Sequence, residues 1–394
     1  MLQPVDPNER FRSRRAQART RRAARRVSAL AVVALAAAGV ALGARFLTEG
    51  ERAHRSADKP AESASAEKPE KPTPRPLPDE LRGVHVTMAL LTLDGKLDEY
   101  LSYTKYGLTA LELDVKDENG EVAFTSRYAP LAKRVGSARN YYRPGPVVAK
   151  IRAKGLYLIG RVVAFEDPFL SEKRPDLAIR QRGGGVWRND AGLGWTNPYD
   201  KRVWDYNVDI AESAARVGFD EIMFDYVRFP SDGNVDSAVF PGKRAEPKAR
   251  TIADFLAYAR SRLSPLGVRV SAAVFGLSAT RNLGIGQRPR LIAEHVDAIY
   301  PMVYPSHYSL GEYGIDDPNA RPGATVAASL RDFSRAMRGT DATVVPWLQD
   351  FSLGRTYSLY DVEAQIRAAR RMQSAGFLLW NAAGVYTPEA LAGP

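Results

Sequence analysis

Eight short apolar segments separated by helical patterns constrain the fold of this chain more than any other feature of its sequence. They lie at residues 83–88, 109–115, 156–165, 219–225, 268–275, 297–304, 342–348 and 376–381. Such runs are typical of strands that are covered on both faces. Strands that alternate with helices form a parallel sheet, and eight of them close into a barrel. The sequence therefore predicts an α/β fold, a (β/α)8 TIM barrel.

The segments between these runs have helical periodicity, and several end in a glycine just before the next apolar run. The helical patterns cover 96–106, 145–154, 200–217, 247–264, 288–296, 323–338 and 358–375, and the glycines are Gly107, Gly155, Gly218, Gly267 and Gly376. Glycine readily adopts the left-handed conformation that ends many helices. An open doubly wound sheet is the alternative fold. No GxGxxG loop follows the first apolar run, which favours the barrel.

The stretch GFDEIMFDYVRFPSD, residues 218–232, carries the most chemistry. A strongly apolar run ends in Asp225, Tyr226 and Arg228. These groups are costly to bury unless they bind one another or a ligand. In a parallel barrel this end of the strand is where catalysis takes place. Asp225 is therefore the first catalytic candidate, and an ion pair with Arg228 is its structural alternative.

Polar and aromatic residues also follow the other predicted strands. Because all eight strand-to-helix loops lie on one face of a barrel, we expect these side chains to be neighbours. Carboxylates beside Trp and Tyr suit a sugar, since aromatic rings stack on sugar faces and carboxylates bind hydroxyls or transfer protons. The further candidates are Asp114, Lys116, Glu166, Asp167, Trp195, Tyr304, His307, Trp347, Gln349, Asp350, Trp380 and Asn381.

Several of these candidates also have a purely structural interpretation. Asp114 could cap a helix, and Asp167 could begin a loop because Pro168 follows it. The tryptophans could belong to the core. His307 could be an ordinary surface histidine.

Composition excludes several classes of function. The chain contains no cysteine and four histidines without paired spacing, so we expect neither a metal site nor a cofactor. Its formal charge of +11 is concentrated at the N-terminus, where residues 1–26 contain nine arginines against Asp6 and Glu9. The rest of the chain is only modestly basic, and nucleic-acid binding is not expected.

The N-terminal region predicts export. Residues 1–26 form a basic arm that we expect in the cytoplasm. An uncharged run at 27–44 lies within a predicted membrane anchor at 27–47. A cleaved signal peptide, with a small-residue site at 41–44, is the alternative. Residues 48–78 form a linker rich in Pro, Lys and Glu, and the barrel at 79–394 is expected in the periplasm or at the cell surface.

The motifs from about residue 81 onward resemble a bacterial family of predicted glycoside hydrolases, a domain family of unknown function with a TIM barrel distantly like that of α-amylase. The resembling segments are LELDVKDENG, GLYLIGRVVAFEDP, WTNPYDKRVWDYN, GFDEIMFDYVRFPSDG, RNLGIGQ, DAIYPMVYPSHY, VVPWLQDF and GFLLWNAAGVY. The resemblance implies a polysaccharide or oligosaccharide substrate, with Asp225 as nucleophile or base. It also implies an acidic residue in the fifth strand, where this chain has Ala273. Asp350 or the pair Glu166–Asp167 would then supply the proton.

Two functions remain open at this level. The chain is either an exported, membrane-anchored glycoside hydrolase or a carbohydrate-binding barrel without catalysis. Two carboxyl groups about 5–5.5 Å apart predict retention of anomeric configuration, and about 6.5–9.5 Å predicts inversion. The absence of an opposed carboxyl pair would favour the binding protein.

Overall fold

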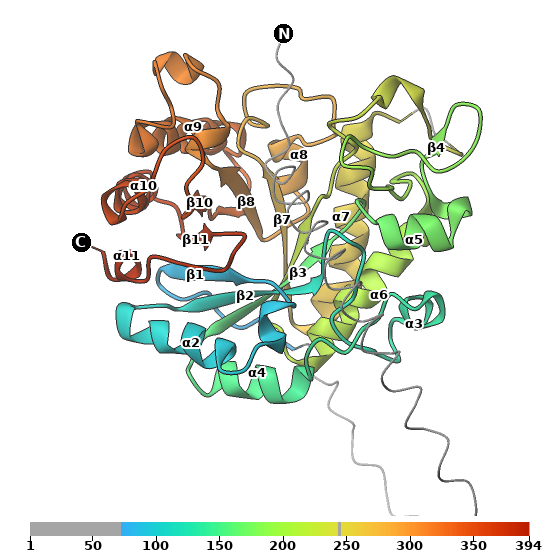
Figure 1. Ribbon diagram of the computed structural model, residues 1–394, viewed down its shortest axis with the longest axis horizontal. Helices are drawn as coiled ribbons and strands as arrows, with labels where there is room; N and C mark the ends of the chain where they lie inside the picture. Colours follow the sequence, from blue (N-terminus) through green and yellow to red (C-terminus); the bar gives the residue numbers. More distant parts are fainter. Residues whose placement is uncertain (1–71, 243–245, 394) are drawn as a thin grey trace, which may run out of the picture. The chain divides into compact units, whose positions relative to one another are not determined.

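The computed structural model describes residues 72–242 and 246–393, and this part of the chain contains a closed eight-stranded parallel barrel (Figure 1). The seventh strand is in two pieces, because Pro346 lacks the N–H that would continue the ladder. Pairing of β10 with β8 and of β11 with β1 closes the barrel. The strands are β1 (Leu81–Val86), β2 (Ala110–Lys116), β3 (Tyr157–Val163), β5 (Glu221–Asp225), β7 (Arg269–Phe275), β8 (Ala298–Val303), β9 (Thr343–Val344) with β10 (Trp347–Gln349), and β11 (Gly376–Trp380). The predicted TIM barrel is confirmed.

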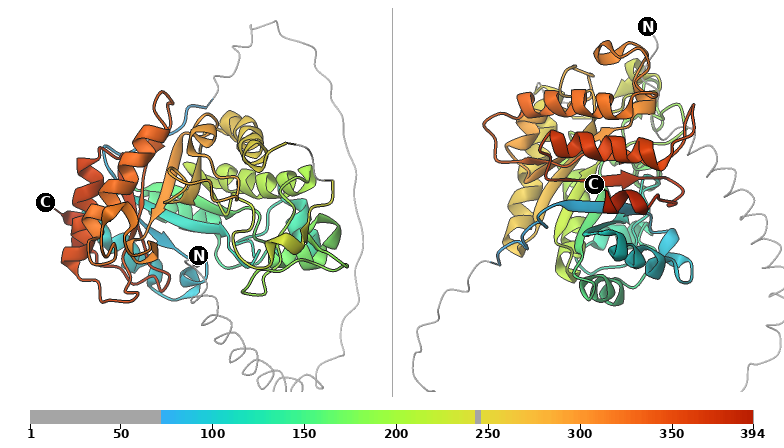
Figure 2. Two further views of the ribbon diagram at one scale, coloured as in Figure 1. Left: turned by 90° about the horizontal axis from the view of Figure 1, so that it is seen from above. Right: turned by 90° about the vertical axis from the view of Figure 1, so that its left-hand side faces the viewer.

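Helices cover the outside of the barrel, and α9 and α10 pack side by side, as Figure 2 shows. The principal helices are α2 (Lys96–Ser102), α4 (Pro144–Arg152), α6 (Lys201–Val217), α7 (Lys248–Leu263), α8 (Pro289–Ala293), α9 (Pro322–Ala336) and α10 (Leu359–Arg371). Shorter ones are α3 (Pro130–Val135), α5 (Pro168–Lys173) and α11 (Glu389–Ala392). Each of the seven helical patterns in the sequence corresponds to one of the principal helices.

Helix α6 shows how local sequence sets the bounds of an element. Asp200 caps its start by accepting a hydrogen bond from the Arg202 N–H at 2.9 Å. Gly218 ends it at φ +107°, a conformation that side chains with a Cβ rarely adopt. The chain then enters β5 within a few residues. The glycine thus sets the direction in which the chain leaves α6 and enters β5, the strand that carries Asp225.

Strand residues alternate between a helix-facing layer and the barrel interior. On β2 and β5 the outward residues Leu111, Leu113, Ile222 and Phe224 belong to the main hydrophobic core. The inward positions of the same strands include Glu112, Asp114 and Asp225, all buried. Charged groups therefore occupy the interior of the barrel and must compensate one another there.

Two strand-to-helix loops dock on each other beside the C-terminal ends of the strands. The loop after β3 contributes β4 (Arg180–Gln181), which pairs antiparallel with β6 (Ala238–Val239) from the loop after β5. Trp187 Nε1 donates to the Asn234 carbonyl at 2.8 Å across the same contact. The two loops together form a small cap around Trp195 and the residues that follow Asp225.

The chain before β1 packs on the barrel rather than leaving it directly. Arg75 donates to the Leu156 carbonyl at 2.8 Å and to Asp220 at 3.2 Å. The packed chain therefore begins before residue 79, the predicted start of the domain. In the described part of the chain, no helix combines the length and apolar character that a membrane span requires. The predicted anchor at 27–47 lies outside the described residues.

Candidate active site

Arg161 of β3 joins two strand-end carboxylates at the C-terminal end of the barrel. Its Nε and Nη2 donate to Asp225 Oδ2 at 2.9 and 2.7 Å, and its Nη1 donates to Asp114 Oδ1 at 2.8 Å. All three residues are buried. Burial lowers the pKa of Arg161, but Asp225, Asp114 and Glu118 outweigh it and raise that pKa well above its usual value. The guanidinium is therefore a permanent charge between the two carboxylates.

A buried histidine lies next to this trio, on β1. His85 Nδ1 lies 2.5 Å from Glu112 Oε2, and its Nε2 lies 3.8 Å from Asp114 Oδ1. Burial lowers the pKa of His85, but the carboxylates of Glu112 and Asp114 outweigh it and raise the pKa above its ordinary value. His85, Glu112, Asp114, Arg161 and Asp225 thus form one continuous charge network inside the barrel.

The loop after β2 adds two more carboxylates to the same region. Glu118 Oε2 lies 3.5 Å from Arg161 Nη1. Asp117 is buried and accepts hydrogen bonds from the backbone N–H groups of Asn119 and Glu121, both at 3.0 Å. Burial, with Glu118 and Asp114 nearby, raises the pKa of Asp117 to about 7. A carboxyl group with this pKa can hold a proton near neutral pH.

Aromatic residues from β8, β10 and β11 form one wall of the site. Tyr304 and Trp380 stack with ring centroids 5.4 Å apart, and Phe351 meets both rings edge-on. His307 packs against Tyr304 and Phe351. Trp347 connects this wall to the charge network, because the Arg161 guanidinium lies 5.9 Å from its ring centre. The predicted aromatic residues of these three strands therefore do gather at one end of the barrel.

Arg228 does not pair with Asp225, so that structural interpretation of Asp225 was wrong. Arg161, from a different strand, is the partner of Asp225. Arg228 instead lies among the rings of Trp195, Tyr226 and Phe275. Tyr226 has φ +49°, an uncommon conformation for a residue other than glycine. This turn at Tyr226 lies between Asp225 and Arg228 in the chain.

Several buried polar atoms in this region have no hydrogen-bond partner within residues 72–242 and 246–393. Most buried polar atoms in proteins are paired, so each exception requires an explanation. A polar ligand such as a sugar would supply the missing acceptors and donors. At the C-terminal end of the barrel the atoms are Trp195 Nε1, Arg228 Nε, Tyr304 Oη and Trp347 Nε1.

Lys116 ends β2 and Asp167 follows β3, as the sequence pattern placed them, but their side chains lie on the helix side of the sheet and not in the barrel mouth. A register shift between Asp114 and Lys116 reverses the alternation of β2. Lys116 Nζ then reaches Asp167 at 2.8 Å and Asn207 of α6 at 2.9 Å, with no exposed surface on either charged side chain. Asp167 also caps α5 through the Leu170 N–H at 2.7 Å. Both side chains are therefore engaged in packing α5 and α6.

Asp350, Gln349 and Asn381 are held in contacts between loops. Asp350 accepts from the Thr387 N–H at 2.7 Å and its hydroxyl at 2.8 Å. Gln349 accepts from the Ser306 N–H at 3.0 Å, and Asn381 Nδ2 donates to the Asp350 carbonyl at 2.5 Å. Burial raises the pKa of Asp350 although the Thr387 hydrogen bonds oppose this. These three residues shape the rim of the barrel.

Glu166 is buried beneath the cap formed by the loops after β3 and β5. Asn189 Nδ2 donates to its Oε2 at 3.3 Å, and the backbones of Glu166 and Trp195 form an isolated bridge. Glu166 thus supports the segment that presents Trp195. Its backbone contact with Trp195 places it beside the site.

Sequence reasoning missed the residues that organise the site, namely His85, Glu112, Arg161, Asp117 and Glu118. A signal for three of them was present. His85, Glu112 and Arg161 are isolated charged or titratable residues inside otherwise apolar strand runs. Such residues are rarely buried without partners, so this signal could have indicated an interior charge cluster.

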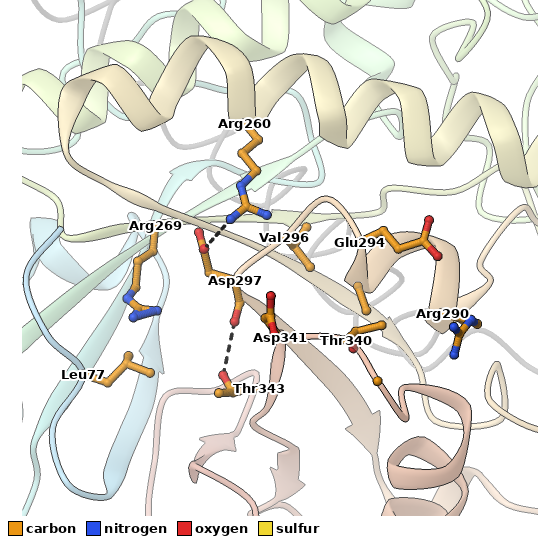
Figure 3. Close-up of a pocket in the computed structure, with 12 residues that line it drawn as sticks. Leu77, Arg260, Arg269, Arg290, Glu294, Val296, Asp297, Thr340, Asp341 and Thr343 are labelled. Atoms are coloured by element: carbon orange, nitrogen blue, oxygen red, sulfur yellow. Dashed lines mark hydrogen bonds and ion pairs between the residues drawn. The ribbon is translucent and has the colours of Figure 1, made fainter. Parts of the chain in front are cut away.

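A pocket of about 490 Å³ lies at the opposite, N-terminal end of the strands (Figure 3). Arg260 of α7 pairs with Asp297 at 3.0 Å, and Thr343 donates to the Asp297 carbonyl at 3.3 Å. Leu77, from the segment before β1, lines the same pocket. In TIM-barrel enzymes the active site lies at the C-terminal ends of the strands, so this pocket is not the candidate active site. In the described residues, no group of acidic or histidine side chains is arranged to hold a metal ion.

Comparison with known proteins places this barrel in a family. A family described as "Putative glycosyl hydrolase domain" matches residues 83–386, from β1 to beyond β11. The chain belongs to this family. The predicted membership is confirmed, and the matched region contains the whole charge network and the aromatic wall of this glycosyl hydrolase domain.

Two solved structures are similar to the glycosyl hydrolase domain. A hypothetical protein from Ruminiclostridium thermocellum ATCC 27405 is 37% identical, with 48% of this chain and 96% of that chain covered and a TM-score of 0.44. The glycoside hydrolase domain of PgaB (BpsB) from Bordetella bronchiseptica is 15% identical, with coverage of 79% and 98% and a TM-score of 0.57. The second likeness shows a shared fold. Among curated proteins, none matches the chain.

Proposed function

We propose that this protein hydrolyses a glycosidic bond of a polysaccharide at the C-terminal end of its barrel. The observation that carries the proposal is the group of carboxylates around Arg161, which binds Asp225 and Asp114 and lies 3.5 Å from Glu118, the neighbour of Asp117. Glycoside hydrolysis in most families requires two carboxyl groups that flank the bond. Membership in a glycosyl hydrolase domain family and a fold shared with a glycoside hydrolase domain support the same activity.

Asp225 is the nucleophile or the general base in this proposal. Its Oδ2 binds the Arg161 guanidinium through two charge-assisted hydrogen bonds, and its Oδ1 accepts from the Tyr226 N–H at 2.7 Å. Such bonds favour the ionised carboxylate that attack on an anomeric carbon or activation of water requires. The buried aromatic residues Tyr304, Trp347 and Trp380 line the same end of the barrel, and a sugar hydroxyl would supply the partners that Tyr304 Oη and Trp347 Nε1 lack among the described residues.

The proton donor comes from the acidic residues after β2. Ala273 occupies the interior position on β7, so that strand offers no carboxyl group there. Asp117, whose pKa is raised to about 7, can remain protonated near neutral pH. Asp350 and Asp167 are less suitable because of their positions, since Thr387 holds Asp350 at the rim of the barrel and Asp167 pairs with Lys116 on the helix side of the sheet.

Incubation of the protein with a panel of polysaccharides, followed by product analysis, tests the activity. New reducing ends are the expected result, and their anomeric configuration distinguishes retention from inversion. If a polysaccharide is bound but never cleaved, the protein is a carbohydrate-binding barrel without catalysis. The unpaired polar atoms and the aromatic wall are compatible with that function.

We also propose that the hydrolase is anchored in the membrane through residues 27–47 with its barrel outside the cytoplasm. The uncharged run at 27–44 after nine arginines supports this topology. The full-length protein should sediment with membranes, and protease added to intact spheroplasts should reach the barrel. A mature N-terminus near Arg45 would show a cleaved signal peptide instead.

A further inference from the structure

Arg228 is a buried cation in an aromatic cage. It is 1% exposed. Its guanidinium carbon lies 4.9 Å from the ring centre of Trp195, 5.0 Å from that of Tyr226 and 4.7 Å from that of Phe275. Cation–π contacts of this kind contribute favourably at a desolvated site. The cage therefore fixes the guanidinium in one place.

The hydrogen bonds of Arg228 use one side of the guanidinium. Its Nη1 donates to the Phe229 carbonyl at 3.2 Å and to Ser231 Oγ at 3.0 Å. Its Nε is buried and has no partner among residues 72–242 and 246–393. Within the described chain, Nε therefore lacks the acceptor that a carboxylate oxygen would supply.

No carboxylate of the described residues forms an ion pair with Arg228. Ser231 connects Arg228 to the carboxylate of Asp232, whose Oδ2 accepts from the Ser231 hydroxyl at 3.3 Å. Two other buried cations among the described residues do have counter-charges. Lys116 pairs with Asp167, and Arg161 pairs with Asp114 and Asp225. A buried charge without a direct counter-charge is costly unless a ligand provides one.

The position of Arg228 connects it to the proposed reaction. Arg228 follows Asp225 by three residues, and the Tyr226 ring, which begins the turn between them, contacts both Trp195 and Arg228. We propose that Arg228 binds the carboxylate of a uronic acid residue, so that the substrate is an acidic polysaccharide. This inference rests on the proposed function only in placing the uronate next to the cleaved bond.

Binding measurements on the full-length protein test this inference without requiring turnover. Isothermal titration calorimetry compares oligomers of galacturonate, glucuronate and mannuronate, each with its carboxyl-reduced neutral counterpart. At least one uronate oligomer should bind about tenfold more tightly than its neutral counterpart. That difference should shrink as salt is raised from 50 to 500 mM, because the contact is charged. Equal binding within all three pairs would overturn the inference.

Variants of Arg228 identify the group responsible. Arg228→Met keeps an apolar side chain in the cage and should remove the preference for the uronate while neutral oligomers still bind. Arg228→Lys keeps the charge without the planar edge and should retain a smaller preference. Arg371→Met, which removes an exposed cation from α10, is the matched control and should leave the preference unchanged.

The outcomes separate this inference from the proposed function. Cleavage of neutral polysaccharides with no uronate preference would overturn the role of Arg228 and leave the hydrolase. Uronate binding without cleavage of any polymer would support the role of Arg228 and overturn the hydrolase. If circular dichroism shows that Arg228→Met does not fold, the binding measurements on Arg228→Lys test the inference instead. A preference for the uronate as large as that of the parent protein would then overturn the inference.

Discussion

Replacing Asp225 with asparagine tests the proposed chemistry most directly. The parent carboxylate accepts two hydrogen bonds from Arg161 at Oδ2 and one from the Tyr226 N–H at Oδ1. An amide of the same shape has one acceptor oxygen and one NH₂ group. Either Arg161 or the Tyr226 N–H must therefore face a donor in Asp225→Asn, and the negative charge disappears.

The structure gives the size of both expected effects. Removing one partner of a buried ion pair typically costs about 3–5 kcal/mol. Arg161 still binds Asp114 at 2.8 Å, so we expect the lower end, about 3 kcal/mol of unfolding free energy. Loss of the nucleophile or base should lower kcat about a thousandfold or more, which corresponds to about 4 kcal/mol of activation free energy. Folding should survive while turnover does not.

Initial rates and urea unfolding, measured on the same samples, separate the two effects. Asp350→Asn is the matched control, because it makes the same chemical change in a buried strand-end carboxylate whose oxygens bind Thr387. It should lower stability with a much smaller effect on kcat. Parental kcat in Asp225→Asn, or a larger loss of kcat in Asp350→Asn, would refute the assignment of Asp225.

Three further predictions concern packing, pH and the N-terminal segment. Lys116→Met should lower the unfolding free energy by about 3–5 kcal/mol, because it leaves Asp167 buried without its counter-charge. A rise in KM without this loss of stability in urea unfolding would show instead that Lys116 contacts the substrate. Asp117 has a folded-state pKa of about 7, above its ordinary value of 3.8, so its stabilising contribution is full below about pH 4 and is lost as pH rises through about 7. Asp117→Asn should therefore flatten the fall in stability between these limits in urea unfolding at pH 4–8, and an unchanged fall would exclude Asp117 as its source. A chain beginning at residue 78 should have a lower midpoint of thermal unfolding than one beginning at residue 72, because it lacks the contacts of Arg75 with Asp220 and Leu156; equal midpoints would show that this segment contributes no stability.

The barrel itself could be predicted from the sequence because its signals are local. Apolar runs, helical periodicity and a glycine such as Gly218 at a helix end act within a few residues of one another. The strand that carries Asp225 was found in this way. The same reasoning placed Tyr304, Trp347 and Trp380 at the C-terminal end of the barrel, since alternation along a strand and the common direction of parallel strands are properties of the fold class.

The pairing of charges depended on contacts that no sequence spacing encodes. Asp225 and Arg228 are close in the chain, yet a turn at Tyr226 separates them and Asp225 pairs with Arg161, 64 residues away. A register shift in β2 moved Lys116 from the interior to the helix side. Each of these outcomes follows from neighbouring strands and helices that meet only in the closed barrel.

The sequence by itself thus determined which segments become strands and which strand ends carry polar groups, because hydrophobic periodicity and helix termination are local. The tertiary structure alone decided which of those polar groups face a common site. Burial makes an unpaired charge costly, so the fate of each charge depends on its partners in three dimensions. Asp167 is neutralised by Lys116, Asp225 is held beside Asp114 by Arg161, and Arg228 has an Nε without a partner in the described chain.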